Sequence, residues 1–222
     1  MSPGALARWI ATLDLPAGLV WAVSAPVSSD AGLFPVETRA IARAVAARRA
    51  EFAGGRHAAR AALAKLGMPP APIPVGPGRA PVWPAGVVGS LTHTRDLCLA
   101  VCATTDLFVT LGIDLEPDHP LDTDLVAEIA LPGELFAQGG LANAPRRLFS
   151  AKEALFKAQF PLTGAIMGFQ AMRCDMAAGQ AEFTDHPDTA PVPPGLRARG
   201  LPVRQWCADG VILSLSALPA GL

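Results

Sequence analysis

Two carboxylates, Asp114 and Glu116, are separated by a single residue within the segment LGIDLEP. The segment is predicted to be a buried strand, and side chains alternate between the two faces of a strand, so both acids project to one side. Two carboxylates a few ångströms apart repel each other. A hard divalent cation relieves this repulsion, and Mg²⁺ commonly binds one or two carboxylates together with substrate phosphates. The alternative is a strand end whose acids simply face water.

A second cluster of polar residues lies downstream, in the segment FSAKEALFK. At helical spacing the segment and its flanks have an apolar stripe and an opposite polar face. The stripe contains Leu148, Ala151, Leu155 and Ala158, and the polar face contains Ser150, Glu153 and Lys157. Two structural interpretations compete with a chemical one: an S-x-x-E capping box, and an ordinary i,i+4 ion pair between the last two polar residues.

Lysine usage favours the chemical interpretation of this helix. The chain contains three lysines against fifteen arginines, and two of the three, Lys152 and Lys157, lie here. Lysine carries a compact ammonium that acts as a point charge and can lose a proton, which the arginine guanidinium does not.

Three further segments could bind an anion. Gly54-Gly55 precedes a predicted helix, and a helix N-terminus presents free N–H groups to anions. Arg56 and Arg60 lie one turn apart and could fork onto a phosphate. Arg79 stands in an otherwise uncharged loop, and His93 follows a strand ending in Gly-Ser-Leu-Thr. The alternatives are a solvated arginine face, a lone surface guanidinium and a structural histidine.

The sequence predicts the elements that carry these residues. The first half has a predicted strand over residues 19–27, helices over 36–52 and 56–66 separated by Gly54-Gly55, and strands over 87–91, 97–103 and 108–115. Residues 67–86 are rich in Pro and Gly and are predicted to be irregular.

The second half has predicted helices over residues 122–130 and 145–160, with a loop through Gly139-Gly140 between them and Pro161 ending the second. Strands are predicted over 171–175, 180–184, 203–208 and 211–217, with a hairpin turn at Asp209-Gly210. Residues 187–195 are predicted to be a Pro-rich surface loop. The predicted fold class is therefore α+β.

Composition indicates a globular protein. The chain has 222 residues, 51% of them hydrophobic and 17% charged, and its formal net charge of −1 gives no support to nucleic-acid binding. No apolar run is long enough to span a bilayer, and the N-terminus lacks a signal-peptide pattern, so we expect a cytoplasmic protein. The four cysteines lack metal-ligand spacing and are predicted to be small buried residues: Cys98, Cys102, Cys174 and Cys207.

The motifs occur in a characteristic order: G-R-H-A-A-R-A-A-L, G-R-x-P-x-W-P, G-S-L-T-H-T, G-I-D-L-E and F-S-x-K-E-A-x-x-K, over roughly residues 50–160. This set resembles the 4′-phosphopantetheinyl transferases, specifically the two-lobed surfactin/enterobactin-synthetase type. The resemblance implies transfer of 4′-phosphopantetheine from coenzyme A to a serine of an apo acyl, peptidyl or aryl carrier protein. The other product is adenosine 3′,5′-bisphosphate.

The family's fold is two similar α+β lobes related by a pseudo-twofold, with coenzyme A in the cleft between them. The expected N-terminal lobe, residues 1–117, would supply the nucleotide contacts and two metal carboxylates. The expected C-terminal lobe, residues 118–222, would supply the K-E-A-x-x-K helix and dock the carrier protein near residues 160–169.

The resemblance also implies roles for individual residues. The ligands of Mg²⁺, or of Mn²⁺, would be Asp114, Glu116 and Glu153. Glu153 would act as the general base, directly or through a metal-bound water. Lys157 would offset charge on the leaving phosphate or protonate it, and Lys152 would contact a phosphate or orient the site. The remaining coenzyme A contacts would be Arg56 and His93 on the 3′-phosphate, Arg60 beside them, and Arg79 near the nucleotide.

Two other functions are compatible with parts of this pattern. A Mg²⁺-dependent pyrophosphohydrolase would share the acid cluster but would cleave coenzyme A without a carrier protein. A non-catalytic module would bind coenzyme A or a carrier without transfer. The carrier's pathway (fatty-acid, polyketide, siderophore or amino-acid metabolism) stays open. We expect a monomer without nucleic-acid or membrane partners.

Overall fold

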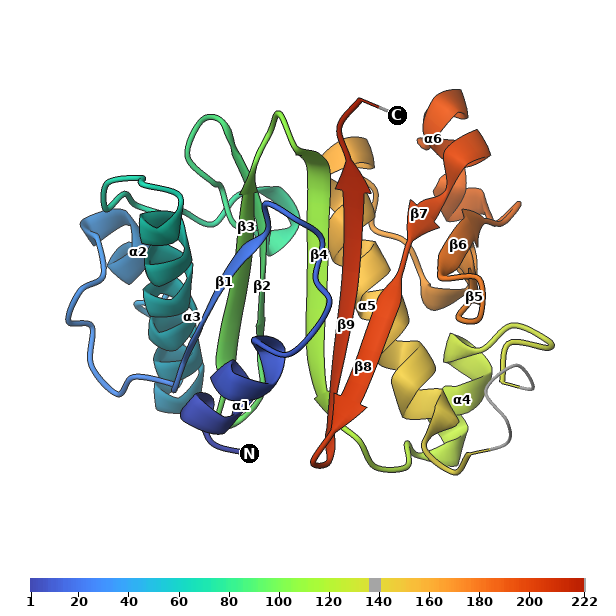
Figure 1. The fold of residues 1–222 in the computed structure, drawn as a ribbon, viewed down its shortest axis with the longest axis horizontal. Helices are drawn as coiled ribbons and strands as arrows, with labels where there is room; N and C mark the ends of the chain where they lie inside the picture. The colour runs from blue at the N-terminus through green and yellow to red at the C-terminus, as the bar shows by residue number, and fades with distance from the viewer. Residues whose placement is uncertain (136–140, 222) are drawn as a thin grey trace. The chain divides into compact units, whose positions relative to one another are not determined.

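The computed structural model describes residues 1–135 and 141–221 and shows a mixed α/β chain with antiparallel sheets. The chain divides into two compact units (Figure 1). Unit 1 comprises Met1–Leu111 with the chain end from Pro219, and unit 2 comprises Gly112–Leu218. The loop predicted through Gly139-Gly140 lies outside the described residues.

Unit 1 is built from a long helix, α3, packed on a three-stranded antiparallel sheet in the order β1-β3-β2. Its core contains alanines of α3 against small residues of β3, so the helix lies close to the sheet. The predicted strands of this half are confirmed. Its elements are α1 (Pro3–Ile10), β1 (Val20–Ser24), α2 (Pro35–Ala40), α3 (Ala46–Lys65), η1 (Pro77–Arg79), β2 (Val87–His93) and β3 (Cys98–Thr104).

The predicted helix break at Gly54-Gly55 is wrong, because α3 continues through both glycines. Glycine costs a helix interior about 1 kcal/mol relative to alanine, so its presence here has a packing reason. A Cβ at Gly54 would lie 2.5 Å from the carbonyl oxygen of Ala25 and 2.8 Å from the sulfur of Cys98. The residues that follow are therefore inside a helix, and the expected anion site at a helix N-terminus does not form there.

Unit 2 is built around the helix α5, which packs on a sheet in the order β4-β9-β8 (Figure 1). A second sheet has the order β5-β6-β7. The elements are β4 (Phe108–Pro117), α4 (Thr123–Ile129), α5 (Ala144–Thr163), η3 (Phe169–Ala171), β5 (Met172–Asp175), β6 (Gln180–Phe183), η4 (Pro187–Thr189), α6 (Pro194–Arg199), β7 (Leu201–Pro202), β8 (Arg204–Ala208) and β9 (Val211–Pro219).

The division between the units falls inside β4, between Leu111 and Gly112, whereas the predicted boundary follows residue 117. From Gly112 onward β4 belongs with the second half of the chain, since it shares a sheet with β9 and contacts α5. Asp114 and Glu116 therefore lie in the same unit as the helix that carries Glu153, and not in the first lobe as expected.

The predicted apolar stripe of α5 is confirmed: its four residues are fully buried in the core of unit 2, with β5, β6 and α6 around them. Two other predictions fail locally. Pro161 lies inside α5, which ends at Gly164 in the left-handed conformation (φ 66°). Residues 187–195 contain η4 and the start of α6.

The hairpin at Asp209-Gly210 is confirmed, since β8 and β9 pair on either side of it. Both turn residues have positive φ angles, 48° and 74°, as a two-residue turn of this type requires. Within the described residues, the helices are too short or too polar to cross a membrane.

Gly112 brings the strand and helix backbones of unit 2 into contact. A Cβ at this position would lie 1.9 Å from the carbonyl oxygen of Ala154 and 2.6 Å from the backbone nitrogen of Ala158, both in α5. Because these obstacles are backbone atoms, no side-chain rotation could relieve the clash. The glycine of the G-I-D-L-E motif is therefore required for β4 to lie directly on α5.

We predict that Gly112→Ala lowers the free energy of unfolding by about 3 kcal/mol, the upper end of the usual cost of overpacking a core. Urea unfolding monitored by tryptophan fluorescence measures this loss. Gly195→Ala is the matched control, because a Cβ on Gly195 in α6 meets nothing within 4 Å. Equal stability of the two variants would contradict the close contact.

Candidate active site

Strand β4 directs Asp114 and Glu116 toward α5. Residues two apart share a face of a strand, so both acids lie on the side of Gly112, which contacts the helix. Asp114 is only 4% exposed, whereas Glu116, near the strand end, is half-buried. The prediction that the two carboxylates share one face agrees with this arrangement.

Helix α5 supplies the cation that meets these acids. The ammonium of Lys157 donates to Asp114 Oδ1 at 2.7 Å and to the backbone oxygen of Ile113 at 3.0 Å. Ser150 lies inside the helix, fully buried, and its hydroxyl is 2.9 Å from that of Ser214, so it does not cap a helix. The polar face of α5 therefore packs on the sheet and is not simply a solvated surface.

The carboxylates of this region influence one another electrostatically. Burial raises the pKa of Glu116, the charge of Asp114 raises it further, and Arg146, at 3.1 Å, opposes both effects. Burial also raises the pKa of Glu153, where the charge of Lys157 opposes the shift and that of Asp114 adds to it. The charge of Asp114 thus disfavours the ionised forms of both Glu116 and Glu153, which is a setting that attracts cations.

The donor chemistry of these three acids suits a hard divalent cation, since all of the atoms on offer are carboxylate oxygens. In residues 1–135 and 141–221, however, no three His, Cys, Asp or Glu side chains are grouped closely enough to hold an ion. In this conformation Lys157 and Arg146 supply positive charge beside Asp114 and Glu116.

The hydrogen bonds of Lys152 differ from the expected contact with a phosphate. Its ammonium is buried and donates to Glu134 Oε2 at 2.8 Å and to two backbone oxygens, those of Ile129 at 2.8 Å and Phe169 at 3.0 Å. A tetrahedral ammonium has three N–H donors, and these three acceptors use all of them. An orienting role, the other expectation for this residue, is compatible with the structure.

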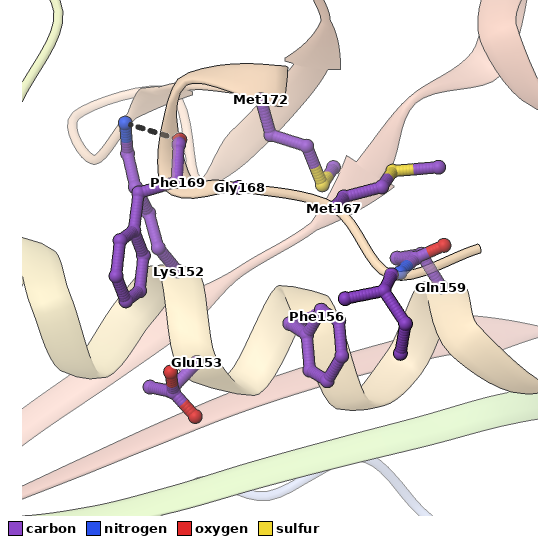
Figure 2. A pocket seen from close by; sticks show the side chains of 9 residues that line it. Lys152, Glu153, Phe156, Gln159, Met167, Gly168, Phe169 and Met172 are labelled. Carbon is purple, nitrogen blue, oxygen red and sulfur yellow. Dashed lines mark hydrogen bonds between the residues drawn. The ribbon is translucent and has the colours of Figure 1, made fainter. Parts of the chain in front are cut away.

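A pocket of about 170 Å³ opens beside the helix, and its wall is mainly apolar (Figure 2). Figure 2 shows Lys152 and Glu153 leaving α5 in different directions, with Phe156 one turn further along. The opposite wall is the segment between α5 and β5, where Ile166 is 66% exposed. The lining residues are Lys152, Glu153, Phe156, Gln159, Ile166, Met167, Gly168, Phe169 and Met172.

In unit 1, Arg56 and Arg60 lie one turn apart on α3 as predicted, and both approach the fully buried Glu37. Arg60 Nη1 donates to both carboxylate oxygens, at 2.9 and 3.0 Å, in place of the expected phosphate. Arg56 Nε lies 4.0 Å from Glu37 and donates to the backbone oxygen of Ile73 at 2.8 Å. Burial lowers the pKa of Arg56 to about 10, so it stays charged at neutral pH.

His93, at the end of β2, lies beside an arginine that the sequence did not single out. Arg48 donates to His93 Nε2 at 2.7 Å, and Glu51 is within 3.4 Å of Arg48 and 3.7 Å of His93 Nδ1. Strands β2 and β4 belong to different sheets, so His93 and Asp114 do not share a sheet. Arg79 is exposed and has a positive φ of 67°, which is uncommon for a non-glycine residue.

Sequence reasoning missed four charged residues that complete these clusters: Glu37, Arg48, Glu134 and Arg146. Only Arg146 had a local signal, because it lies one turn before Ser150 on the same helix and the sequence left it unassigned. The other three come from segments distant in the chain, and spacing alone does not reveal such partners.

Three of the four cysteines are buried as predicted, and Cys207 is exposed, which contradicts the prediction for that residue. Cys207 lies in β8, a strand at the edge of the β4-β9-β8 sheet. Burial raises the pKa of Cys98 to about 11 and of Cys102 to about 12, so neither thiol is reactive at neutral pH.

We predict that Lys157→Met raises the pKa of Glu153, because it removes the positive charge that stabilises the ionised carboxylate. Carbon-detected NMR of the glutamate carboxyl groups against pH measures the shift. Arg147→Met is the control, since Arg147 pairs with Asp118 and should raise the pKa of that acid while leaving Glu153 unchanged. An unchanged Glu153 in the lysine variant would show that the two groups are not coupled.

Comparison with known proteins agrees with the motif resemblance. Residues 36–103 match the 4′-phosphopantetheinyl transferase N-terminal domain, and residues 110–202 match the 4′-phosphopantetheinyl transferase superfamily. The chain is similar to the 4′-phosphopantetheinyl transferase Svp of Streptomyces mobaraensis, with 39% identity covering 90% of this chain and 88% of the relative. It is similar to the 4′-phosphopantetheinyl transferase Npt of Nocardia iowensis, with 38% identity covering 91% and 97%.

The 4′-phosphopantetheinyl transferase PptT of Mycobacterium tuberculosis is 45% identical over 149 residues, which cover 64% of this chain and 66% of the relative. The two family matches together span both units, and the two longer alignments cover most of each chain. The chain therefore belongs to the 4′-phosphopantetheinyl transferase superfamily.

Proposed function

We propose that this chain transfers the 4′-phosphopantetheine group of coenzyme A to a serine of an apo carrier protein and releases adenosine 3′,5′-bisphosphate. The observation that carries the proposal is the group of Asp114, Glu116, Glu153 and Lys157 on two elements in backbone contact. Relatives that align over most of the chain are named for this activity.

The reaction requires the serine oxygen to attack a diphosphate that already carries negative charge. Catalysis must therefore come mainly from positioning and from compensation of charge. Asp114, Glu116 and Glu153 would hold Mg²⁺, or Mn²⁺, which also accepts oxygen ligands. When bound, the ion neutralises charge on the diphosphate oxygens.

Glu153 is the proposed general base. A base works best when its pKa approaches the operating pH, and burial raises the pKa of Glu153 in that direction. It would take the serine proton directly or through a water. Lys157 would bind the leaving phosphate, since its ammonium is part-buried beside Asp114.

The pocket beside α5 is the proposed site of the pantetheine arm. This arm is a flexible chain with apolar segments and amides, and the pocket combines apolar walls with a few polar groups. Glu153 lines the pocket and also interacts with Asp114, so the arm would lead directly to the reacting phosphate.

Unit 1 would bind the nucleotide end of coenzyme A. Arg56 and His93 are the proposed contacts of the 3′-phosphate, and the hydrogen bond between Arg48 and His93 adds a second arginine to that set. Arg79 would contact the nucleotide. Arg60 donates to Glu37 of α2, so we propose that it connects α3 to α2 and does not contact a phosphate.

Both units contain a twenty-residue helix on a three-stranded antiparallel sheet, α3 in unit 1 and α5 in unit 2. This repetition supports the arrangement of two similar lobes, with nucleotide contacts in the first and carrier docking in the second. The apolar rim of the pocket around Ile166 is the proposed contact of the carrier protein, and we propose that the chain works as a monomer.

Mass spectrometry of intact apo carrier proteins tests this function. We predict that at least one carrier gains one phosphopantetheine when incubated with the protein, coenzyme A and Mg²⁺, and that EDTA abolishes the gain. Coenzyme A cleaved without carrier modification would instead indicate a pyrophosphohydrolase. Coenzyme A bound and left intact would indicate a binding module.

We predict that Glu153→Gln lowers the transfer rate by about 10²-fold or more, the usual contribution of a positioned acid or base, while coenzyme A still binds. Stopped reactions analysed by mass spectrometry give the rate, and calorimetry gives the affinity. Glu182→Gln on β6 is the control, because Glu182 is an exposed glutamate of the same unit. Full activity of the Glu153 variant would remove this residue from the mechanism.

A further inference from the structure

The most enclosed ion pair of unit 2 lies against the pocket and not among the acids of β4. The side chains of Lys152 and Glu134 are 2% and 1% exposed, compared with 27% for Lys157. Lys152 is adjacent in sequence to Glu153 and lines the pocket. The pair is therefore enclosed within the protein while its lysine borders the pocket.

The pair connects α5 to three other segments. Glu134 accepts hydrogen bonds from the backbone nitrogens of Leu131 at 2.5 Å and Cys174 at 2.8 Å, in addition to the bond from Lys152. Lys152 in turn donates to the backbone oxygens of Ile129 and Phe169. The end of α4, strand β5 and the η3 turn are thus all attached to one lysine–glutamate pair.

One of these bonds holds a wall of the pocket. Phe169 follows Met167 and Gly168, and the dashed line in Figure 2 marks the bond from Lys152 to its carbonyl oxygen. The Phe169 ring also packs against Phe149 of α5, with ring centroids 5.4 Å apart. The distance between α5 and this wall is therefore fixed by a charged hydrogen bond and an aromatic contact.

We propose that Lys152 and Glu134 are positioning residues, which hold the 167–172 wall against α5 and so preserve the pocket without touching a substrate phosphate. The identification of the pantetheine arm as the ligand of that pocket rests on the proposed function above. The geometry of the ion pair is independent of that function.

Charge explains why both members of the pair are needed. Removal of one partner of a buried ion pair leaves an uncompensated charge, which is strongly destabilising, whereas removal of both charges is often tolerated. A lysine that bound a substrate phosphate would behave differently, because neutralising Glu134 could not restore the lost contact with the phosphate. The double variant Lys152→Met/Glu134→Gln therefore separates the two roles.

The first experiment uses the protein without ligand. Hydrogen–deuterium exchange should show at least tenfold faster exchange of residues 167–172 in Lys152→Met and in Glu134→Gln, and partial recovery in the double variant. Arg147→Met, which breaks the partly exposed pair with Asp118, is the matched control and should leave this segment unchanged. Unchanged exchange of the segment in all variants would overturn the proposal.

The second experiment compares two ligands by calorimetry: coenzyme A, which carries the pantetheine arm, and adenosine 3′,5′-bisphosphate, which lacks it. We predict that Lys152→Met binds coenzyme A at least tenfold more weakly and the bisphosphate within twofold of the unmodified protein. The double variant should regain part of the lost affinity, because the uncompensated charge is removed while the bond to Phe169 stays lost. It also serves if the single variant does not fold.

Equal weakening for both ligands, without recovery in the double variant, would show that Lys152 contacts phosphate and would overturn the proposal. If the unmodified protein binds neither ligand, the proposed function is what fails, and the exchange experiment alone decides the role of the pair.

Discussion

The contact between the backbones of β4 and α5 at Gly112 is the constraint on which the rest of unit 2 depends. A side chain at this position would push the helix away from the strand, because the carbonyl oxygen of Ala154 occupies the space of a Cβ. At the resulting separation, Lys157 reaches Asp114 at 2.7 Å, and Ser150 reaches Ser214 on β9 at 2.9 Å. One small residue therefore sets the distances among the charged groups of two elements.

Unit 2 contains two kinds of ion pair, which differ in the exposure of their side chains. Lys152 and Glu134 are enclosed, so a ligand could replace either partner only by leaving the other charge buried and uncompensated. Lys157 and Arg146 are partly exposed, at 27% and 18% of their side chains, and pair with acids whose ionised forms repel each other. Water reaches both members of the Arg146–Glu116 pair, since Glu116 is 22% exposed, whereas the side chain of Asp114 is only 6% exposed and Lys157 is the accessible member of its pair. Accessible charges contribute little net pairing energy, because water screens them.

Local patterns predicted most elements and the identity of the acidic cluster, because strand alternation and helix periodicity are properties of neighbouring residues. The failures arose where a distant contact overrides a local preference. Gly54 has the residue type of a helix break, but it lies inside α3, and its missing side chain lets Ala25 and Cys98 lie directly against the helix. Arg60 resembles a phosphate ligand, but Glu37, far away in sequence, takes its charge. Lys152 also resembles a phosphate ligand, but it is buried against Glu134, a partner that had no local signal in the sequence.

The scarcity of lysine directs attention to α5, and the contacts of its two lysines show why arginine would not serve at either position. Lys152 meets three acceptors that surround one nitrogen, an arrangement that suits a tetrahedral ammonium and not a planar guanidinium fork. Lys157 donates to two acceptors of β4 within the described residues, which leaves one N–H of its ammonium for an incoming anion. The same residue type thus uses all three donors at position 152 and two of them at position 157, and the number of acceptors around each nitrogen makes the difference.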